Sequence, residues 1–175
     1  MLQTKIKQTL RDVADFPKPG IIFKDITPVL KDASLCAEIT DALALQLKDV
    51  KIDVVAGIES RGFLFGLALA QALKVPFVPI RKAGKLPYKT IQQAYELEYG
   101  SATLEVHEDA FTAGQHVLIH DDLLATGGTV VAASKLVHQL QANVAAYSFL
   151  ISLDFLNGKQ RLAEFSQHTF SLVNY

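Results

Sequence analysis

Two adjacent carboxylates, Asp121 and Asp122, precede a short run of small residues that contains two glycines. The run reads Ala125-Thr126-Gly127-Gly128-Thr129 and leads into an apolar stretch with helical spacing. Glycines let a backbone approach a ligand closely, and the free N–H groups and dipole of a helix start favour a phosphate. Carboxylates beside a phosphate would repel it, so we expect them to face ribose hydroxyls or a divalent cation. The segment predicts a site for a phosphorylated sugar.

A second group of charges lies in residues 81–89, directly after an apolar segment. Four of these residues are basic, Arg81, Lys82, Lys85 and Lys89, and the segment also contains a glycine and a proline but no periodicity. We predict a mobile loop. Charge alone would favour a solvated surface, but the position after a predicted strand favours a role in binding an anion.

Apolar segments alternate with amphipathic ones along the chain, which places both charged groups in an α/β sheet. Strands are predicted at residues 53–57, 75–80, 117–120 and 144–153, and helices at 34–48, 63–73 and 130–140. Strand, helix and strand within residues 53–80 form a βαβ unit, so the sheet is predicted to be parallel. Ligands of such sheets bind beyond the carboxyl ends of the strands.

The remaining segments are predicted from local spacing. Residues 2–13 carry apolar residues at helical spacing, and the two prolines and the glycine of residues 16–20 would stop that helix. Ser34 is predicted to cap the helix at 34–48, and Cys36 to be a buried, inert thiol. Residues 94–99 and 102–106 are predicted to form a hairpin that turns at Gly100-Ser101.

Composition limits the class of protein. The 175 residues are half hydrophobic and carry a net charge of −1, which fits one domain and excludes a polyanion binder that relies on bulk charge. The apolar stretch at residues 63–70 is far shorter than the roughly 20 residues of a membrane span. A single cysteine suits a reducing compartment. We therefore expect a cytoplasmic protein that binds neither nucleic acid nor membranes.

Residues 121–129 resemble the phosphoribosyl pyrophosphate (PRPP) motif of the type I phosphoribosyltransferases. Nearly the whole chain shares the resemblance, through residues 15–30, 57–66, 80–87 and 95–100. The first of these stretches, together with residues 97–100, is similar to the adenine-specific members of the family. Neither a Walker phosphate loop nor a G-x-G-x-x-G motif is present, so the P-loop and Rossmann classes have little support.

The resemblance implies a fold, a reaction and an assembly. The fold is a single α/β domain over residues 1–175, with a mostly parallel central sheet flanked by helices, a small N-terminal hood at about residues 1–32 and a mobile loop. The reaction converts adenine and PRPP to AMP and diphosphate with Mg²⁺. A homodimer is implied as well.

The resemblance also implies the roles of individual residues. The 5-phosphate and ribose are expected at Asp121, Asp122, Ala125, Thr126, Gly127, Gly128 and Thr129, with the metal held through PRPP and water beside the two aspartates. The diphosphate is expected at Ser60, Arg61, Arg81, Lys82 and Lys85, the last three from the neighbouring subunit, with a non-proline cis peptide before Ser60. Adenine is expected at Ile22, Phe23, Lys24 and Leu153. Glu98 is expected to be the acid–base residue, with Arg61 beside it in catalysis and Tyr99 in the lid.

Two residues depart from the family pattern. His120 stands where an aliphatic strand residue is usual, and we predict a structural role for it. Lys24 replaces an arginine, which keeps the charge and loses the fork geometry. The other histidines, His107, His116, His138 and His168, are predicted to lie on the surface. Two alternative functions stay open: transfer to another purine base, or a PRPP-sensing regulator without catalysis.

Overall fold

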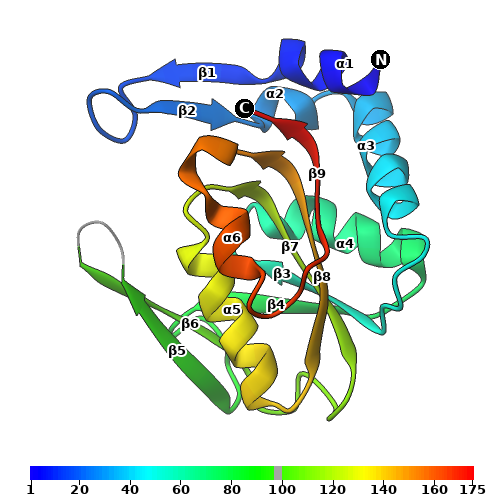
Figure 1. The fold of residues 1–175 in the computed structure, drawn as a ribbon, viewed down its shortest axis with the longest axis vertical. Helices are drawn as coiled ribbons and strands as arrows, with labels where there is room; N and C mark the ends of the chain where they lie inside the picture. The colour runs from blue at the N-terminus through cyan, green and yellow to red at the C-terminus, as the bar shows by residue number, and fades with distance from the viewer. Residues whose placement is uncertain (97–99) are drawn as a thin grey trace.

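A mixed β-sheet forms the centre of the molecule (Figure 1). The computed structural model describes residues 1–96 and 100–175. Within them the sheet strands are β3 (Val54–Ile58), β4 (Phe77–Lys82), β5 (Thr90–Glu96), β6 (Ser101–His107), β7 (His116–Leu124), β8 (Asn143–Ser152) and β9 (Thr169–Asn174). Their order is β5-β6-β4-β3-β7-β8-β9, with parallel pairing from β4 through β9 and antiparallel pairing of β6 with β4 and β5. The predicted α/β class and parallel core are confirmed.

Helices cover both faces of this sheet, as Figure 1 shows. The long ones are α3 (Ala33–Gln46), α4 (Gly62–Leu73) and α5 (Gly128–Gln139). Alternate residues of β3 point to opposite faces: Val54 and Ala56 belong to the core under α5, and Val55 to the core under α3 and α4. Burial on both faces explains the continuous apolar sequence of the central strands.

The N-terminal hood combines α1 (Leu2–Thr9), β1 (Arg11–Ala14), β2 (Ile22–Asp25) and α2 (Thr27–Leu30). The predicted helix over residues 2–13 is wrong beyond Thr9, because residues 11–14 pair antiparallel with β2. Val13 lies opposite Phe23 in this two-stranded sheet. The short helix α2 was not predicted from the sequence.

Three local predictions need correction. Asp32, and not Ser34, caps α3, because its carboxylate accepts the N–H of Leu35 at 2.9 Å. Ser101 is the first residue of β6 and pairs with Glu96, so the predicted turn at Gly100-Ser101 is wrong. Strand β4 extends to Lys82, so the segment outside the sheet begins after it.

The cysteine and the histidines agree only in part with their predicted environments. Cys36 is only half-buried, although partial burial and the nearby Asp32 raise the pKa of its thiol. His138 and His168 are exposed as predicted. His107 and His116 are half-buried, and His116 is not an isolated surface residue, because its Nδ1 lies 2.8 Å from Oδ2 of Asp53.

The chain after β8 carries a short 3-10 helix, η1 (Asp154–Leu156), then α6 (Gly158–Leu162), before it returns to the sheet as β9. None of these elements was predicted from the sequence. Within residues 1–96 and 100–175, no helix is both long and apolar enough to cross a membrane.

Candidate active site

The acidic pair lies inside β7, because this strand continues to Leu124 and does not end at residue 120 as predicted. Neighbouring side chains of a strand point to opposite faces. Asp122 therefore faces the start of α4, where Nε of Arg61 lies 3.2 Å from its Oδ2. Asp121 lines a cavity with Thr129, and its Oδ1 would lie 3.1 Å from a Cβ at Gly62, the first residue of α4. Both carboxylates thus lie beside the start of α4 and line one cavity with Arg61.

Helix α4 begins directly against β7. A Cβ atom at Gly62 would lie 2.8 Å from the carbonyl oxygen of His120, which only glycine avoids. This close approach brings Arg61, the N-cap of α4, to the acidic pair. The glycine is therefore part of how the chain positions Arg61.

The predicted phosphate-binding run connects β7 to α5. Gly127 has a φ of 81°, in the left-handed region that glycine adopts without strain, and α5 begins at Gly128. We call the cavity above it the loop cavity; its volume is about 180 Å³. It is lined by Arg61, Asp121, Asp122, Leu123, Ala125, Thr126, Gly127, Gly128, Thr129 and Val130. All seven residues predicted for the ribose and 5-phosphate line this cavity.

The electrostatics of the acidic pair suit a ligand that brings positive charge or donors. Asp122 is 1% exposed, and its Oδ2 makes no hydrogen bond within the described residues. Oδ1 of Asp121 accepts the N–H of Asp122 at 2.8 Å. Burial and the neighbouring Asp122 carboxylate raise the pKa of Asp121 well above its ordinary value, and burial raises that of Asp122 despite Arg61. Hydroxyl donors or a cation would relieve this crowding.

A second cavity of about 300 Å³, the Glu59 cavity, adjoins the loop cavity through Arg61, Asp121 and Thr129. Its other lining residues are Ile58, Glu59, Lys82, Tyr95, Ala102 and Leu104. The peptide bond between Glu59 and Ser60 is cis, as expected.

Arg81 is bound to Glu59 through two nitrogens, with Nε 3.1 Å from Oε2 and Nη2 3.3 Å from Oε1. The N–H of Lys82 also donates to Oε2 of Glu59, at 3.0 Å. Burial raises the pKa of Glu59, but these donors outweigh it and hold the pKa below its ordinary value. In this structure Arg81 is therefore already balanced by a carboxylate, and of the three cations predicted for the diphosphate in residues 81–85 it is Lys82 that lines the cavity.

The segment after β4 is fastened by Glu105, a carboxylate of β6 that is 2% exposed. Its Oε1 accepts the N–H groups of Lys85 and Leu86, both at 2.8 Å, and its Oε2 lies 3.3 Å from Oγ1 of Thr90 and 3.2 Å from Nε2 of Gln92. These hydrogen bonds outweigh burial and lower the pKa of Glu105. Lys85 is thus placed by its backbone, while its side chain stays exposed.

We expect Glu105→Gln to loosen this segment. The new amide cannot accept hydrogen bonds at both ends, and buried donors left without a partner cost about 1–3 kcal/mol. The melting temperature should fall, and the KM for PRPP, the substrate that the sequence leads us to expect, should rise several-fold, as thermal unfolding and steady-state kinetics would measure. Glu108→Gln is the matched control, because Glu108 is exposed and its ion pair within residues 1–96 and 100–175 is a single contact of 4.0 Å with Lys89. Equal behaviour of the two variants would contradict this role.

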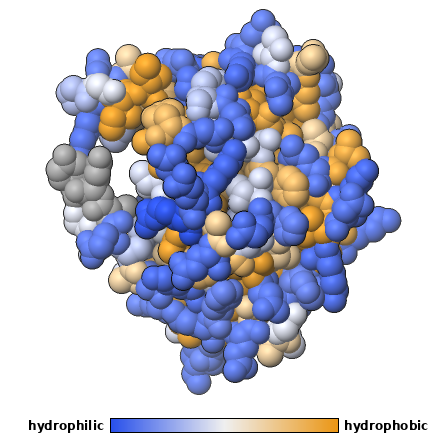
Figure 2. Space-filling view, viewed as in Figure 1, coloured by the Kyte–Doolittle hydropathy of each residue, from blue (hydrophilic) through white to orange (hydrophobic). Residues whose placement is uncertain are grey.

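The third cavity, of about 520 Å³, lies under the hood, and we call it the hood cavity. It is lined by Gly20, Ile21, Ile22, Lys24, Thr126, Leu153, Phe155, Leu156 and Tyr175. Figure 2 shows apolar surface over the β1–β2 hairpin beside it, where Phe16, Ile21 and Ile22 are exposed. Thr126 also lines the loop cavity, so the two adjoin.

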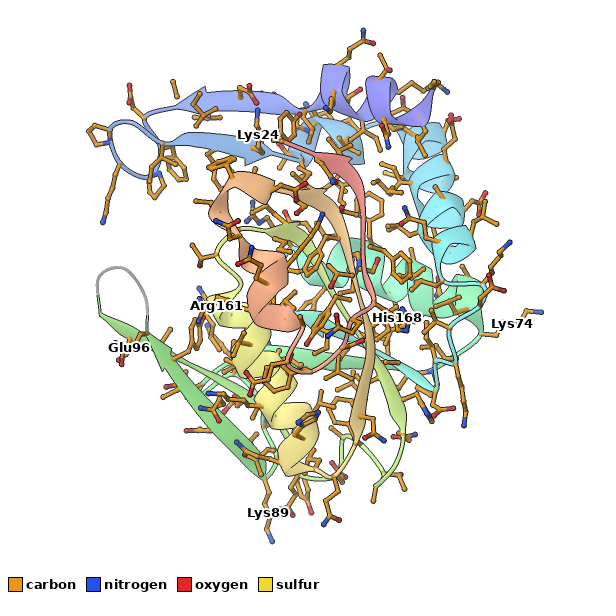
Figure 3. All side chains as sticks on the ribbon, in the orientation of Figure 1. Lys24, Lys74, Lys89, Glu96, Arg161 and His168 are labelled. Carbon is orange, nitrogen blue, oxygen red and sulfur yellow. The ribbon has the colours of Figure 1, made fainter. Side chains whose placement is uncertain are left out.

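Three of the four residues predicted for adenine line the hood cavity. Lys24 is held at its edge, with Nζ 2.7 Å from Oδ1 of Asp12 and 4.1 Å from the ring centre of Tyr175 (Figure 3). Phe23 lies on the opposite face of β2, where Cζ of Arg61 is 4.9 Å from its ring centre. Phe23 therefore belongs to the Arg61 side of the hood.

His120 is fully buried, and neither ring nitrogen has a hydrogen-bond partner within residues 1–96 and 100–175. Burial lowers the pKa of His120 to about 4, so the ring is neutral at pH 7. Its Cδ2 would lie 3.5 Å from a Cβ at Gly66, on the α4 side of the sheet. These surroundings are those of a packed core residue.

Two predicted residues, Glu98 and Tyr99, lie outside the described residues. In the described part of the chain, no group of three or more His, Cys, Asp or Glu side chains could hold a metal ion. The acidic pair, with one oxygen free of hydrogen bonds, still fits Mg²⁺ that is held by substrate oxygens and water, as this ion prefers.

The sequence did not single out Glu105, Arg161 or Gly158. Arg161 donates to the carbonyl oxygen of Thr126 at 3.1 Å, and Gly158 packs against the carbonyl of Ala125. The alternating apolar residues of β6 show where Glu105 lies but not what it binds. Backbone partners of this kind leave no pattern in a sequence.

Comparison with known proteins assigns this site to a family. Residues 28–159 match the family described as "Phosphoribosyl transferase domain". The adenine phosphoribosyltransferase of Cytophaga hutchinsonii is 53% identical over 175 residues, which are 100% of this chain and 97% of that protein. Among solved structures, the adenine phosphoribosyltransferase of Thermoanaerobacter pseudethanolicus has a TM-score of 0.96 and 50% identity, with 100% of both chains covered.

A second solved structure was determined with ligands. The adenine phosphoribosyltransferase of Saccharomyces cerevisiae, complexed with an imino-altritol bisphosphate and adenine, has a TM-score of 0.92 and 44% identity, and the match covers 98% of each chain. The agreement in sequence and fold extends over the hood, the sheet and the loops that line the three cavities. The chain therefore belongs to the adenine phosphoribosyltransferases, within the type I phosphoribosyltransferase family.

Proposed function

We propose that this protein transfers the 5-phosphoribosyl group of PRPP to adenine, forming AMP and releasing diphosphate. The observation that carries the proposal is that the loop cavity, which contains the acidic pair, adjoins two others: the Glu59 cavity through Arg61, Asp121 and Thr129, and the hood cavity through Thr126. The loop cavity suits the ribose 5-phosphate, the Glu59 cavity the diphosphate, and the hood side the base. We further propose that residues 1–175 act as one domain, with residues 1–32 as its hood.

The loop 125–129 binds the 5-phosphate in this proposal. Its glycines permit close approach, and the start of α5 adds free N–H groups and a favourable dipole. Asp121 and Asp122 accept hydrogen bonds from the ribose hydroxyls, and their negative charge stabilises the cationic character that the ribose develops as the diphosphate leaves.

The diphosphate is held by cations. Arg61 lines both the loop cavity and the Glu59 cavity, so it reaches the bond that breaks. Ser60 also binds the leaving diphosphate. In a homodimer, the loop that carries Arg81, Lys82 and Lys85 closes over the site of the neighbouring subunit and neutralises the remaining charge of the diphosphate. Mg²⁺, bound through PRPP oxygens and water, neutralises charge on the diphosphate when it is present.

Adenine binds on the hood. The backbone of Ile22 meets the polar edge of the base, Phe23 stacks on one face, Leu153 covers the other, and Lys24 stands at the rim. Glu98 removes or polarises the N9 proton as N9 attacks the ribose, and Tyr99 belongs to the lid that excludes water. The support for this arrangement is the position of Ile22, Lys24 and Leu153 around one cavity, with Phe23 against Arg61.

We place this reaction in the cytoplasm, because a protein whose single cysteine is a free thiol suits a reducing compartment.

The decisive experiment compares four purine bases. The protein with PRPP and Mg²⁺ is incubated with adenine, guanine, hypoxanthine or xanthine, and nucleotide formation and diphosphate release are measured together. We expect adenine to exceed the others in kcat/KM by about 10²-fold or more, because a site that hydrogen-bonds one edge rejects bases that leave its groups unpaired. Preference for another base would support the first alternative function. PRPP binding without turnover of any base would support the regulator.

A further inference from the structure

Helix α6 packs directly against the back of the loop 125–129. A Cβ atom at Gly158 would overlap the carbonyl oxygen of Ala125, and one at Gly127 would lie 3.1 Å from the carbonyl oxygen of Gly158. Backbone thus meets backbone with no side chain between. The loop is therefore positioned from α6 as well as from the strand and helix that it connects.

Arg161 adds a charged contact to this packing. Its Nη1 donates a hydrogen bond to the carbonyl oxygen of Thr126, the second residue of the loop, at 3.1 Å. The same nitrogen would lie 3.7 Å from a Cβ at Gly128, the first residue of α5. The guanidinium therefore lies beside both the loop and the helix start.

Arg161 lines a cavity, and its positive charge is not paired with an acidic side chain of the described residues. Arg161 lines a cavity of about 290 Å³ with Gly128, Lys135 and Glu96, and Figure 3 shows it extending from α6 on the side where β5 ends at Glu96. No ion pair within 4.0 Å joins Arg161 to an acidic side chain of residues 1–96 or 100–175. By contrast, Arg61 and Arg81 are both paired with carboxylates.

We propose that Arg161 is a positioning residue for the 5-phosphate monoester of PRPP and AMP, an inference that rests on the proposed function. A carbonyl oxygen carries partial negative charge, which opposes a phosphate held in the same loop. A guanidinium on that oxygen offsets the repulsion, fixes the loop in one conformation and adds positive charge close to the anion. The residue acts through the loop and is not required to touch the substrate.

The test measures binding separately from catalysis. We would compare the wild type with Arg161→Met and Arg161→Lys by titration calorimetry with AMP, adenosine and magnesium diphosphate, and by steady-state kinetics with PRPP. AMP and adenosine differ only in the 5-phosphate, so their affinity ratio isolates its contribution. Lys159→Met is the matched control, because Lys159 lies on the same helix, carries the same charge and pairs with Asp154 at 3.0 Å.

Arg161→Met is expected to weaken AMP binding and raise the KM for PRPP about tenfold, as loss of a charged hydrogen bond does. Adenosine and diphosphate affinities should stay within about twofold. Arg161→Lys should recover most of the loss, and Lys159→Met should match the wild type. Equal weakening of AMP and adenosine, or no weakening of either, would overturn the role of Arg161.

These outcomes are distinct from a failure of the proposed function. If the wild type bound AMP with Arg161-dependent affinity but turned over no adenine, the role of Arg161 would stand and the proposed reaction would fall. If the wild type turned over adenine and Arg161→Met kept its KM for PRPP, the reaction would stand and the role of Arg161 would fall.

Discussion

Replacing both Asp121 and Asp122 with asparagine should abolish turnover and at the same time make the unliganded protein more resistant to heat at pH 8. Asparagine has the same shape but carries no charge, so neither the ribose hydroxyls nor the developing positive charge would be stabilised. Loss of one such electrostatic contribution costs about 10²–10³ in rate, so the double variant should lose at least about 10³-fold in kcat. Coupled kinetics and thermal unfolding would measure the two effects.

The expected gain in stability follows from the direction of the pKa shifts. Burial raises the pKa of both aspartates above the unfolded value of 3.8, and the Asp122 charge raises that of Asp121 further. A raised pKa means that the folded state holds its proton more tightly, so this contribution is full below about pH 3.8 and is lost as pH rises through the folded pKa. The double variant should therefore lose less stability than the wild type between pH 5 and pH 8.

Asp53→Asn gives a control of opposite sign. The N–H and ring of His116 hydrogen-bond Asp53 and lower the pKa of its carboxyl, so its contribution is present above pH 3.8 and lost in acid. This variant should keep full activity and be less stable at pH 8. A double Asp121/Asp122 variant that keeps activity would show that the acidic pair does not bind the ribose. One that unfolds at a lower temperature than the wild type at pH 8 would show that the two buried charges do not destabilise the fold.

The central sheet could be predicted from the sequence because strands that are buried on both faces consist of continuous apolar residues. Val54, Val55 and Ala56 form a continuous apolar run only because helices cover the sheet from both sides. The small residues 125–129 likewise indicate a place where the backbone must approach a ligand closely. The residues that this local pattern predicts to lie together all line the loop cavity.

The hood could not be predicted in the same way. Residues 11–14 have sequence Arg-Asp-Val-Ala, which carries no strand pattern, and they become a strand only because β2 pairs with them. The ion pairs between Lys24 and Asp12 and between Arg11 and Asp25 lie across these two strands. Tertiary pairing therefore overrides the helical spacing that extends from α1.

The structural role of charge could not be predicted either. Glu59 and Glu105 were not assigned a role, yet both accept backbone N–H groups from the basic residues 81–89. Each carboxylate fixes part of a segment that is proposed to surround an anionic leaving group. The net charge of −1 thus conceals a division between carboxylates that hold the basic segment in place and carboxylates that are proposed to bind the substrate.

Arg61 both pairs with a buried carboxylate and lines the proposed diphosphate site, so Arg61→Met should have the second largest effect on activity. Its Nε lies 3.2 Å from Asp122, its Cζ lies 4.9 Å from the ring centre of Phe23, and it lines both the loop and the Glu59 cavity. Methionine replaces the unbranched aliphatic part of the arginine side chain but lacks the charged guanidinium. We expect kcat/KM for PRPP to fall about 10³-fold, because a cation beside the leaving diphosphate and the partner of a buried carboxylate are lost together.

Arg61→Lys separates charge from geometry. Lysine keeps the positive charge but lacks the planar fork that can stack on Phe23 while it contacts Asp122. If the stacking positions the base, this variant should recover the KM for PRPP more fully than the KM for adenine, as initial rates with each substrate varied in turn would measure. Arg11→Met, which removes a charge paired with Asp25 at 3.6 Å on the hood, is the matched control and should leave both KM values unchanged. Equal recovery of the two KM values by lysine would mean that Arg61 acts through its charge alone, and an active Arg61→Met variant would remove it from the diphosphate site.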